Sequence, residues 1–149
     1  MEIITEENED FVITTDKTKL DIDVIYDFLT NQSFWARNIT FEKVKTSIEN
    51  SLNFGLFFHD KQIGYARVIS DFSTIAYLGD VFIIEEYRGR GLSKWLLEKV
   101  MNHPNLQGLR RWILLTADAH ELYKKYGWTA ITSPDKWMEK YDSAVYEKQ

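Results

Sequence analysis

The stretch YLGDVFIIEEYRGRGLSKWLLEKV, residues 77–100, predicts a buried strand, a glycine-rich turn and an amphipathic helix in succession. The strand is indicated by the apolar run 81–84, which is rich in β-branched and aromatic residues and too short for a buried helix. The helix is indicated by one apolar stripe at helical spacing, formed by Leu92, Trp95, Leu96 and Val100. The sequence therefore places a glycine turn at a strand-to-helix junction.

The turn itself, RGRGLS, has the chemistry of a site for phosphate groups. The N-terminus of a helix has unpaired N–H groups and a partial positive charge, so it binds anions well. Gly89 and Gly91 let the backbone approach a ligand, and Arg88 and Arg90 add charged donors that fit phosphate oxygens. Ser93 can either cap the helix or donate its hydroxyl group to a phosphate oxygen.

Two common phosphate-binding patterns do not fit this turn. A P-loop requires G-x-x-x-x-G-K-[ST], and no glycine lies five residues before Gly91. A dinucleotide fingerprint requires G-x-G-x-x-G, and Lys94 stands in the place of its third glycine. The turn instead resembles the R/Q-x-x-G-x-G/A pattern of the GCN5-related N-acetyltransferase family, with Arg88, Gly91 and Ser93 at the three positions. Serine replaces the usual glycine or alanine at the last of them.

A later segment, AHELYKKYGW at 119–128, is similar to that family's A-x-x-[FL]-Y-x-[KR]-x-G-F motif. The tyrosine of the motif protonates the departing thiolate of coenzyme A, so the resemblance implies this role for Tyr123. The alternative is a core tyrosine on an amphipathic helix, together with Leu122 and Tyr126. Segments around Trp35 and Trp112 further resemble an uncharacterised bacterial subgroup of the family.

The pattern of the remaining chain predicts an α/β fold. We expect strands at 11–15, 54–58, 63–69, 75–84, 111–116 and 128–131, with 144–147 as a further candidate, and helices at 22–31, after Thr40, at 92–103 and at 119–125. This order predicts a mixed sheet of six or seven strands with flanking helices, in which an antiparallel meander precedes a right-handed parallel crossover. It is the strand order of the acetyltransferase family. We expect one acetyltransferase domain over residues 1–149.

Composition limits the partners and the kinds of chemistry. A net charge of −5 argues against nucleic-acid binding, and no apolar run is long enough for a membrane span, so we expect no nucleic-acid or membrane partner. The acidic start lacks the pattern of a signal peptide and the chain has no cysteine, which is typical of a cytoplasmic protein. We expect no metal, because cysteine ligands are absent and the three histidines are scattered. The resemblance also implies that the protein can form a homodimer.

The resemblance implies acetyl-coenzyme A as the co-substrate, with its pantetheine arm paired to the central strand. The implied coenzyme-binding residues are Val81, Phe82, Ile83, Arg88, Gly89, Arg90, Gly91, Leu92 and Ser93. It further implies a bulge near Val81, which would free a backbone N–H for the oxyanion of the reaction. The substrate would then be a primary amine that attacks the thioester directly in a ternary complex.

The residues on the acceptor side have several interpretations. Asp80, the carboxylate within the apolar central strand, can act as the general base, bind a cationic amine or form a structural pair with Arg67. Trp35 and Arg37 lie in the loop where the family builds its acceptor pocket, and Trp35 can contact an amine or simply fill the core. We therefore predict Tyr123 and Asp80 as catalytic residues and Trp35, Arg37 and Arg67 as substrate-binding residues.

Two other functions fit parts of the pattern. A non-catalytic module that binds or senses acyl-coenzyme A would keep the glycine turn but have no use for Tyr123. A domain that binds nucleotides or other phosphates would need only the turn and its arginines. Turnover with amines separates the first alternative from an acetyltransferase, and stabilisation by ATP but not by coenzyme A would favour the second.

Overall fold

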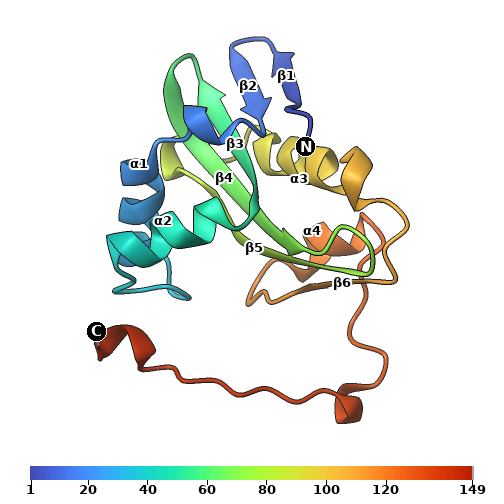
Figure 1. Ribbon diagram of the computed structural model, residues 1–149. Coiled ribbons are helices and arrows are strands. Elements are labelled where there is room, and N and C mark those ends of the chain that lie inside the picture. The colour runs from blue at the N-terminus through green and yellow to red at the C-terminus, as the bar shows by residue number, and fades with distance from the viewer. Residues whose placement is uncertain (149) are drawn as a thin grey trace.

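A computed structural model describes residues 1–148, and these residues form a six-stranded mixed sheet with helices on both faces (Figure 1). In sheet order the strands are β1 (Thr5–Asn8), β2 (Phe11–Thr14), β3 (Leu52–Phe58), β4 (Lys61–Ser70), β5 (Ile75–Ile83) and β6 (Arg111–Leu114). Neighbours from β1 to β5 are antiparallel, whereas β5 and β6 are parallel. The structure thus confirms the predicted meander followed by a parallel crossover.

The helices divide between the two faces of the sheet (Figure 1). One face is covered by α1 (Ile22–Asp27), by the π-helical turn that follows it (Phe28–Gln32) and by α2 (Phe41–Glu49). The other face is covered by α3 (Leu92–Met101) and by the short α4 (His120–Lys124). Thr40 caps α2 by accepting a hydrogen bond from the N–H of Lys43, as its position before the apolar pattern predicts.

A separate hydrophobic cluster lies on each face. Beneath α3, the fully buried Leu96 and Val100 pack against apolar side chains of β3, β4 and β5. Beneath α1 and α2, the rings of Phe28 and Phe82 stack with their centroids 3.9 Å apart. Since β5 contributes side chains to both clusters, it is held from both sides. None of the helices within residues 1–148 is long and apolar enough to cross a membrane.

Two predicted strands are wrong. Trp128 lies just beyond α4 and is tied back to it, because its N–H donates to the carbonyl of Tyr123. Its ring packs against Trp112, and residues 129–131 are exposed and irregular. Val145–Glu147 is a 3₁₀ turn that pairs with no strand of the sheet within residues 1–148. The acidic start contains β1 instead, an exposed edge strand that pairs with β2. Its side chains are all exposed, so it lacks the alternating pattern that would reveal it.

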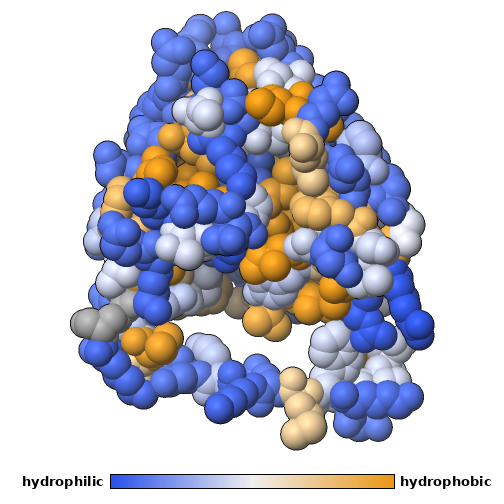
Figure 2. Space-filling model, viewed as in Figure 1, coloured by the Kyte–Doolittle hydropathy of each residue, from blue (hydrophilic) through white to orange (hydrophobic). Residues whose placement is uncertain are grey.

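After α4 the chain leaves the body and returns as a long extended tail (Figure 1). The tail contains the short 3₁₀ turns Pro134–Lys136 and Val145–Glu147, and the second of these lies below α2. In the space-filling view an open window separates the middle of the tail from the rest of the molecule (Figure 2). The tail therefore bridges the open end of the sheet without filling it.

His103, just after α3, is buried with one ring nitrogen unpaired. Its Nδ1 accepts a hydrogen bond from the N–H of Asn105, its ring packs edge-on against Phe54, and Nε2 has no partner within residues 1–148. Burial lowers the pKa of His103 below its ordinary 6.5. The folded protein therefore holds this imidazole neutral.

We expect His103 to make the fold sensitive to acid. As the pH falls below 6.5, the unfolded chain takes up a proton that folded His103 resists, so the free energy of unfolding falls by up to about 1.4 kcal/mol per pH unit until the lowered pKa is reached. Urea unfolding at several pH values measures this slope. His103→Asn keeps an acceptor for the N–H of Asn105 but does not titrate, and should flatten the slope. An equally steep slope in that variant would contradict the prediction.

Candidate active site

The turn between β5 and α3 presents a run of free backbone donors. Within residues 1–148, no group accepts a hydrogen bond from the N–H groups of residues 89–94. The first hydrogen bond of α3 runs from the N–H of Trp95 to the carbonyl of Gly91. Gly89 and Gly91 both have a φ of 77°, and a Cβ added to either would meet nothing within 4 Å. Both glycines thus border open space, and the unpaired donors lie at a helix N-terminus, which suits an anion.

The arginines of the turn have partly structural roles. Arg88 donates from Nε to the carbonyl oxygen of Ile83 at 2.8 Å, which fixes the turn to the end of β5 and leaves its two Nη groups for a ligand. The guanidinium of Arg90 lies over the ring of Tyr87, 5.3 Å from its centroid. Ser93 makes no capping hydrogen bond, and Gly91 is the N-cap. The predicted capping role of Ser93 is therefore wrong, and its role as a ligand donor stays a prediction.

β5 contains a β-bulge near Val81, where the resemblance to the family implied one. Tyr65 pairs with Phe82 and Arg67 pairs with Gly79, so β5 has one residue more than β4 over this interval. Asp80 lies in this bulge and has a φ of 52°. This left-handed conformation is energetically unfavourable for a residue other than glycine. The bulge predicted near Val81 is therefore confirmed, and it breaks the regular pairing of β5 there.

On its other edge, β5 separates from β6. The parallel pairing runs only from Ile75 opposite Arg111 to Leu78 opposite Leu114. Beyond Leu78, the β6-facing edge of β5 has no strand beside it within residues 1–148. Three predicted coenzyme-binding residues lie on this stretch: Val81 is partly buried, and Phe82 and Ile83 anchor the strand in the two clusters. This unpaired edge of β5, called the slot below, leads from the glycine turn toward the bulge. Apart from the carbonyl of Ile83, which Arg88 holds, it can pair with an extended amide-containing chain.

α4 brings Tyr123 to the same face as the glycine turn. The hydroxyl of Tyr126 donates to the carbonyl of Lys94 at 3.1 Å, so α4 is tied to the first turn of α3. Tyr123 is 8% exposed, and its hydroxyl makes no hydrogen bond with the described residues. Burial, and secondarily the charge of Asp118, raises the pKa of Tyr123 above its ordinary 10.0. At neutral pH the side chain is therefore a protonated donor.

Asp80 lies at the centre of a polar network on the opposite face. Its Oδ1 accepts from Nε1 of Trp35 at 2.9 Å and its Oδ2 accepts from Nε of Arg67 at 2.8 Å. Arg67 also donates from Nη1 to the hydroxyl of Ser51. The predicted pair of Asp80 with Arg67 is thus formed, and Trp35 is not a simple core residue. Arg37 is exposed and is not part of this network.

Two tyrosines near Asp80 were missed by the sequence analysis. The ring of Tyr77 lies along the open side of Gly79, and burial followed by the charge of Asp80 raises its pKa. Tyr146, from the tail, packs against the α1–α2 cluster, and burial followed by the charge of Asp80 raises its pKa as well. Strand alternation could have placed Tyr77 two residues before Gly79, but no pattern in the sequence places Tyr146.

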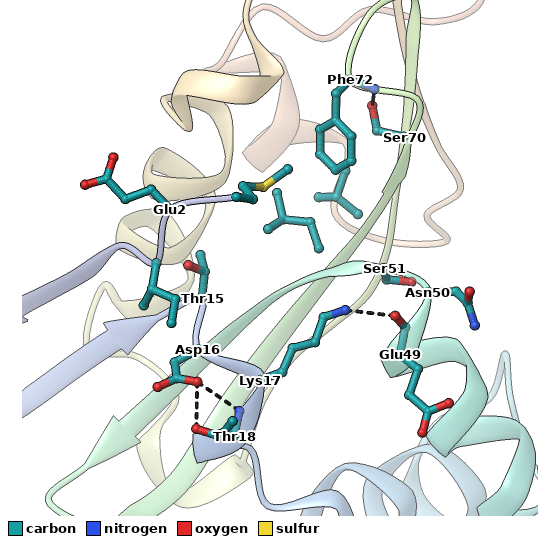
Figure 3. Close-up of a pocket in the computed structure, with 14 residues that line it drawn as sticks. Glu2, Thr15, Asp16, Lys17, Thr18, Glu49, Asn50, Ser51, Ser70 and Phe72 are labelled. Carbon is teal, nitrogen blue, oxygen red and sulfur yellow. Dashed lines mark hydrogen bonds between the residues drawn. The ribbon is translucent and has the colours of Figure 1, made fainter.

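A large cavity in the structure does not coincide with the glycine turn or the Asp80 network. This cavity, of about 570 Å³, lies between the N-terminus, the end of α2 and the β4–β5 hairpin (Figure 3). Its polar groups bind one another: Lys17 donates to the carbonyl of Glu49, and Asp16 accepts from Thr18. None of the glycine-turn residues lines it. Within residues 1–148 no three His, Asp or Glu side chains gather closely enough to hold a metal ion.

Comparison with known proteins adds independent evidence. A model of the Acetyltransferase (GNAT) family matches residues 22–128. A crystal structure of a candidate GNAT-family acetyltransferase from Xanthomonas campestris pv. campestris superimposes with a TM-score of 0.90 and 48% identity, over 91% of this chain and 96% of that one. A candidate acetyltransferase of Gibberella zeae is 30% identical, over 78% of this chain and 77% of its own length.

A more distant structure comes from Clostridium acetobutylicum. It is a candidate acetyltransferase solved with acetyl-CoA, and it superimposes with a TM-score of 0.65 at 14% identity, over 88% of this chain and 94% of that one. At this identity the likeness concerns the fold alone.

Proposed function

This chain belongs to the GNAT acetyltransferase family, and from that premise we propose that it transfers an acetyl group from acetyl-coenzyme A to a primary amine. The observation that carries the proposal is the run of unpaired N–H groups at residues 89–94, next to the unpaired edge of β5. A diphosphate would accept hydrogen bonds from the N–H groups of the turn, and an extended amide chain would pair with the edge of β5. We further propose that residues 1–149 act as a single domain and that the amine attacks in a ternary complex.

In the proposed complex the coenzyme lies along the slot. Its pyrophosphate accepts hydrogen bonds from the backbone of residues 89–94, including Leu92 and Ser93, with Arg88 Nη groups adding charge. Its pantetheine arm runs beside residues 81–83 like an added strand. This arrangement points the thioester at the bulge of β5.

The proposed reaction forms a C–N bond and breaks a C–S bond. The neutral amine attacks the thioester carbonyl, and a backbone N–H at the bulge, near Val81, stabilises the negative oxygen. As the intermediate collapses, Tyr123 donates its proton to the sulfur, and coenzyme A leaves as a thiol. The proton lost by the amine passes to Asp80 or to solvent, and Tyr123 regains one proton, so the products are an amide and a free thiol.

Thiol release from acetyl-coenzyme A across a panel of primary amines tests the proposal. We expect amine-dependent release, and thermal stabilisation by coenzyme A that exceeds that by ATP at equal concentration. At a coenzyme concentration of 100 times Kd, the stabilisation should be about 2.7 kcal/mol. Binding of coenzyme A without turnover of any amine would favour a sensing module. Stabilisation by ATP alone would contradict an acyltransferase.

A further inference from the structure

We propose that the C-terminal tail forms the outer wall of the acceptor site, with Tyr146 as a specificity-determining residue, and that the acceptor is a primary amine with an aromatic or branched aliphatic body. This inference rests on the proposed acetyl transfer, because it assigns the face on which the amine reaches the bulge of β5. It is carried by the path of the tail, by the exposed apolar side chains of the sheet and by the Asp80 network.

The tail is fastened at two places and is free between them. The ring of Trp137 lies against Arg111 of β6, with the guanidinium 5.0 Å from the ring centroid. Eight residues beyond Trp137, the turn Val145–Glu147 begins, and Nζ of Lys43 lies 5.9 Å from the ring centroid of Tyr146. Met138, between these anchors, is 96% exposed. The window in Figure 2 lies under this free middle part, and hydrophobic residues line its upper rim.

The far anchor places Tyr146 beside the residues that would meet an amine. Its ring packs on the cluster that contains Phe82, two residues after Asp80. The pKa of Tyr146 is raised first by burial and then by the charge of Asp80, and the charge of Arg67 opposes this. A residue near the C-terminus therefore shares the electrostatic environment of the bulge. Figure 1 shows the corresponding path of the tail back to the α1–α2 side.

The sheet supplies an apolar floor on this face. Arg67 pairs with Gly79 and Ile69 pairs with Tyr77, so these four residues lie on one face, and Ile75 follows the same alternation. Tyr65, two residues before Arg67, is completely buried beneath α1 and α2, but Ile69 is 47% exposed and Ile75 is 40% exposed. The helices thus leave this end of the face uncovered. An acceptor with an apolar body would bury these side chains.

The Asp80 network supplies a polar end. Trp35 and Arg67 each donate one hydrogen bond to a different carboxylate oxygen of Asp80. Each oxygen keeps a second lone pair that can accept a hydrogen bond from an amine N–H. Trp35 is 42% exposed and packs edge-on against the exposed Phe34, which extends the apolar surface on that side. A positively charged or hydrogen-bonding head beside an apolar body matches this arrangement.

The test compares 2-phenylethylamine with ethanolamine, which has the same primary amine but no apolar body. Calorimetric titration into the protein saturated with coenzyme A gives the Kd of each amine, and thiol release gives KM and kcat. We expect 2-phenylethylamine to bind at least tenfold more tightly than ethanolamine. Tyr146→Ala should raise its Kd and KM about tenfold and change the Kd of coenzyme A less than twofold. Tyr146→Phe should restore tight binding, because the ring forms the wall.

Met138→Ala, on the free part of the same tail, is the matched control and should change none of these values. Equal affinity for both amines, no binding of either, or an unchanged Kd in Tyr146→Ala would overturn the inference, even if other amines are acetylated. Binding that weakens in Tyr146→Ala without any thiol release would support the site and overturn the proposed acetyl transfer.

Discussion

Replacing Tyr123 with phenylalanine is expected to lower kcat by about 10²–10⁴-fold, because general acid catalysis typically contributes that much. The substitution removes a hydroxyl that makes no hydrogen bond with the described residues, so the fold should lose little. The raised pKa of Tyr123 keeps the proton available well above neutral pH. As Tyr123 loses its proton, kcat of the wild type should therefore fall at alkaline pH, and that alkaline limb should vanish in Tyr123→Phe. Steady-state thiol release from pH 6 to about 11 measures both effects.

Tyr126→Phe is the control for this prediction, since it removes a hydroxyl from the same short helix. That hydroxyl donates to the carbonyl of Lys94, so its loss should cost about 0.5–1.5 kcal/mol of stability and change kcat less than threefold. Equal activity of wild type and Tyr123→Phe would return Tyr123 to a core role. Water would then protonate the departing thiolate of coenzyme A.

The strand–turn–helix unit was predictable because its determinants are local. An apolar run, two glycines and a helical stripe lie within 24 residues, and the backbone N–H groups that they leave free follow from helix geometry alone. The pair of Asp80 with Arg67 was also predictable, as one of three alternatives, because neighbouring strands of a meander bring such residues together. The bulge was expected from the resemblance to the family and not from any pattern in β5.

The errors concern segments whose structure depends on distant contacts. Residues 128–131 have strand-like composition, but the Trp128 ring packs on Trp112 and Tyr123, and no strand is available to pair with them. The role of Arg88 as a clamp on the carbonyl of Ile83 depends on the exact curvature of the turn. The position of Tyr146 depends on the whole path of the tail, which no local propensity encodes.

Replacing Gly91 with aspartate is expected to abolish most coenzyme binding, with a rise in Kd of about 100-fold or more. A carboxylate at this N-cap would approach the N–H groups of residues 92–94 and repel a pyrophosphate from the same donors. Loss of two hydrogen bonds to a charged group, at about 1.5 kcal/mol each, already corresponds to this factor. Calorimetric titration with coenzyme A measures it. Thermal unfolding should show a smaller cost of about 1 kcal/mol, from placing a side chain at a φ of 77°.

Gly108→Asp separates this electrostatic effect from backbone strain. Gly108 has a φ of 72°, and a Cβ there would also meet nothing within 4 Å, but it lies beyond α3 and away from the turn. Both substitutions place a side chain at a similar φ, and only Gly91→Asp should lose the coenzyme. If Gly91→Asp binds coenzyme A as tightly as Gly108→Asp does, the pyrophosphate does not lie on these donors. The slot along β5 would then have to be occupied by a ligand that is anchored elsewhere.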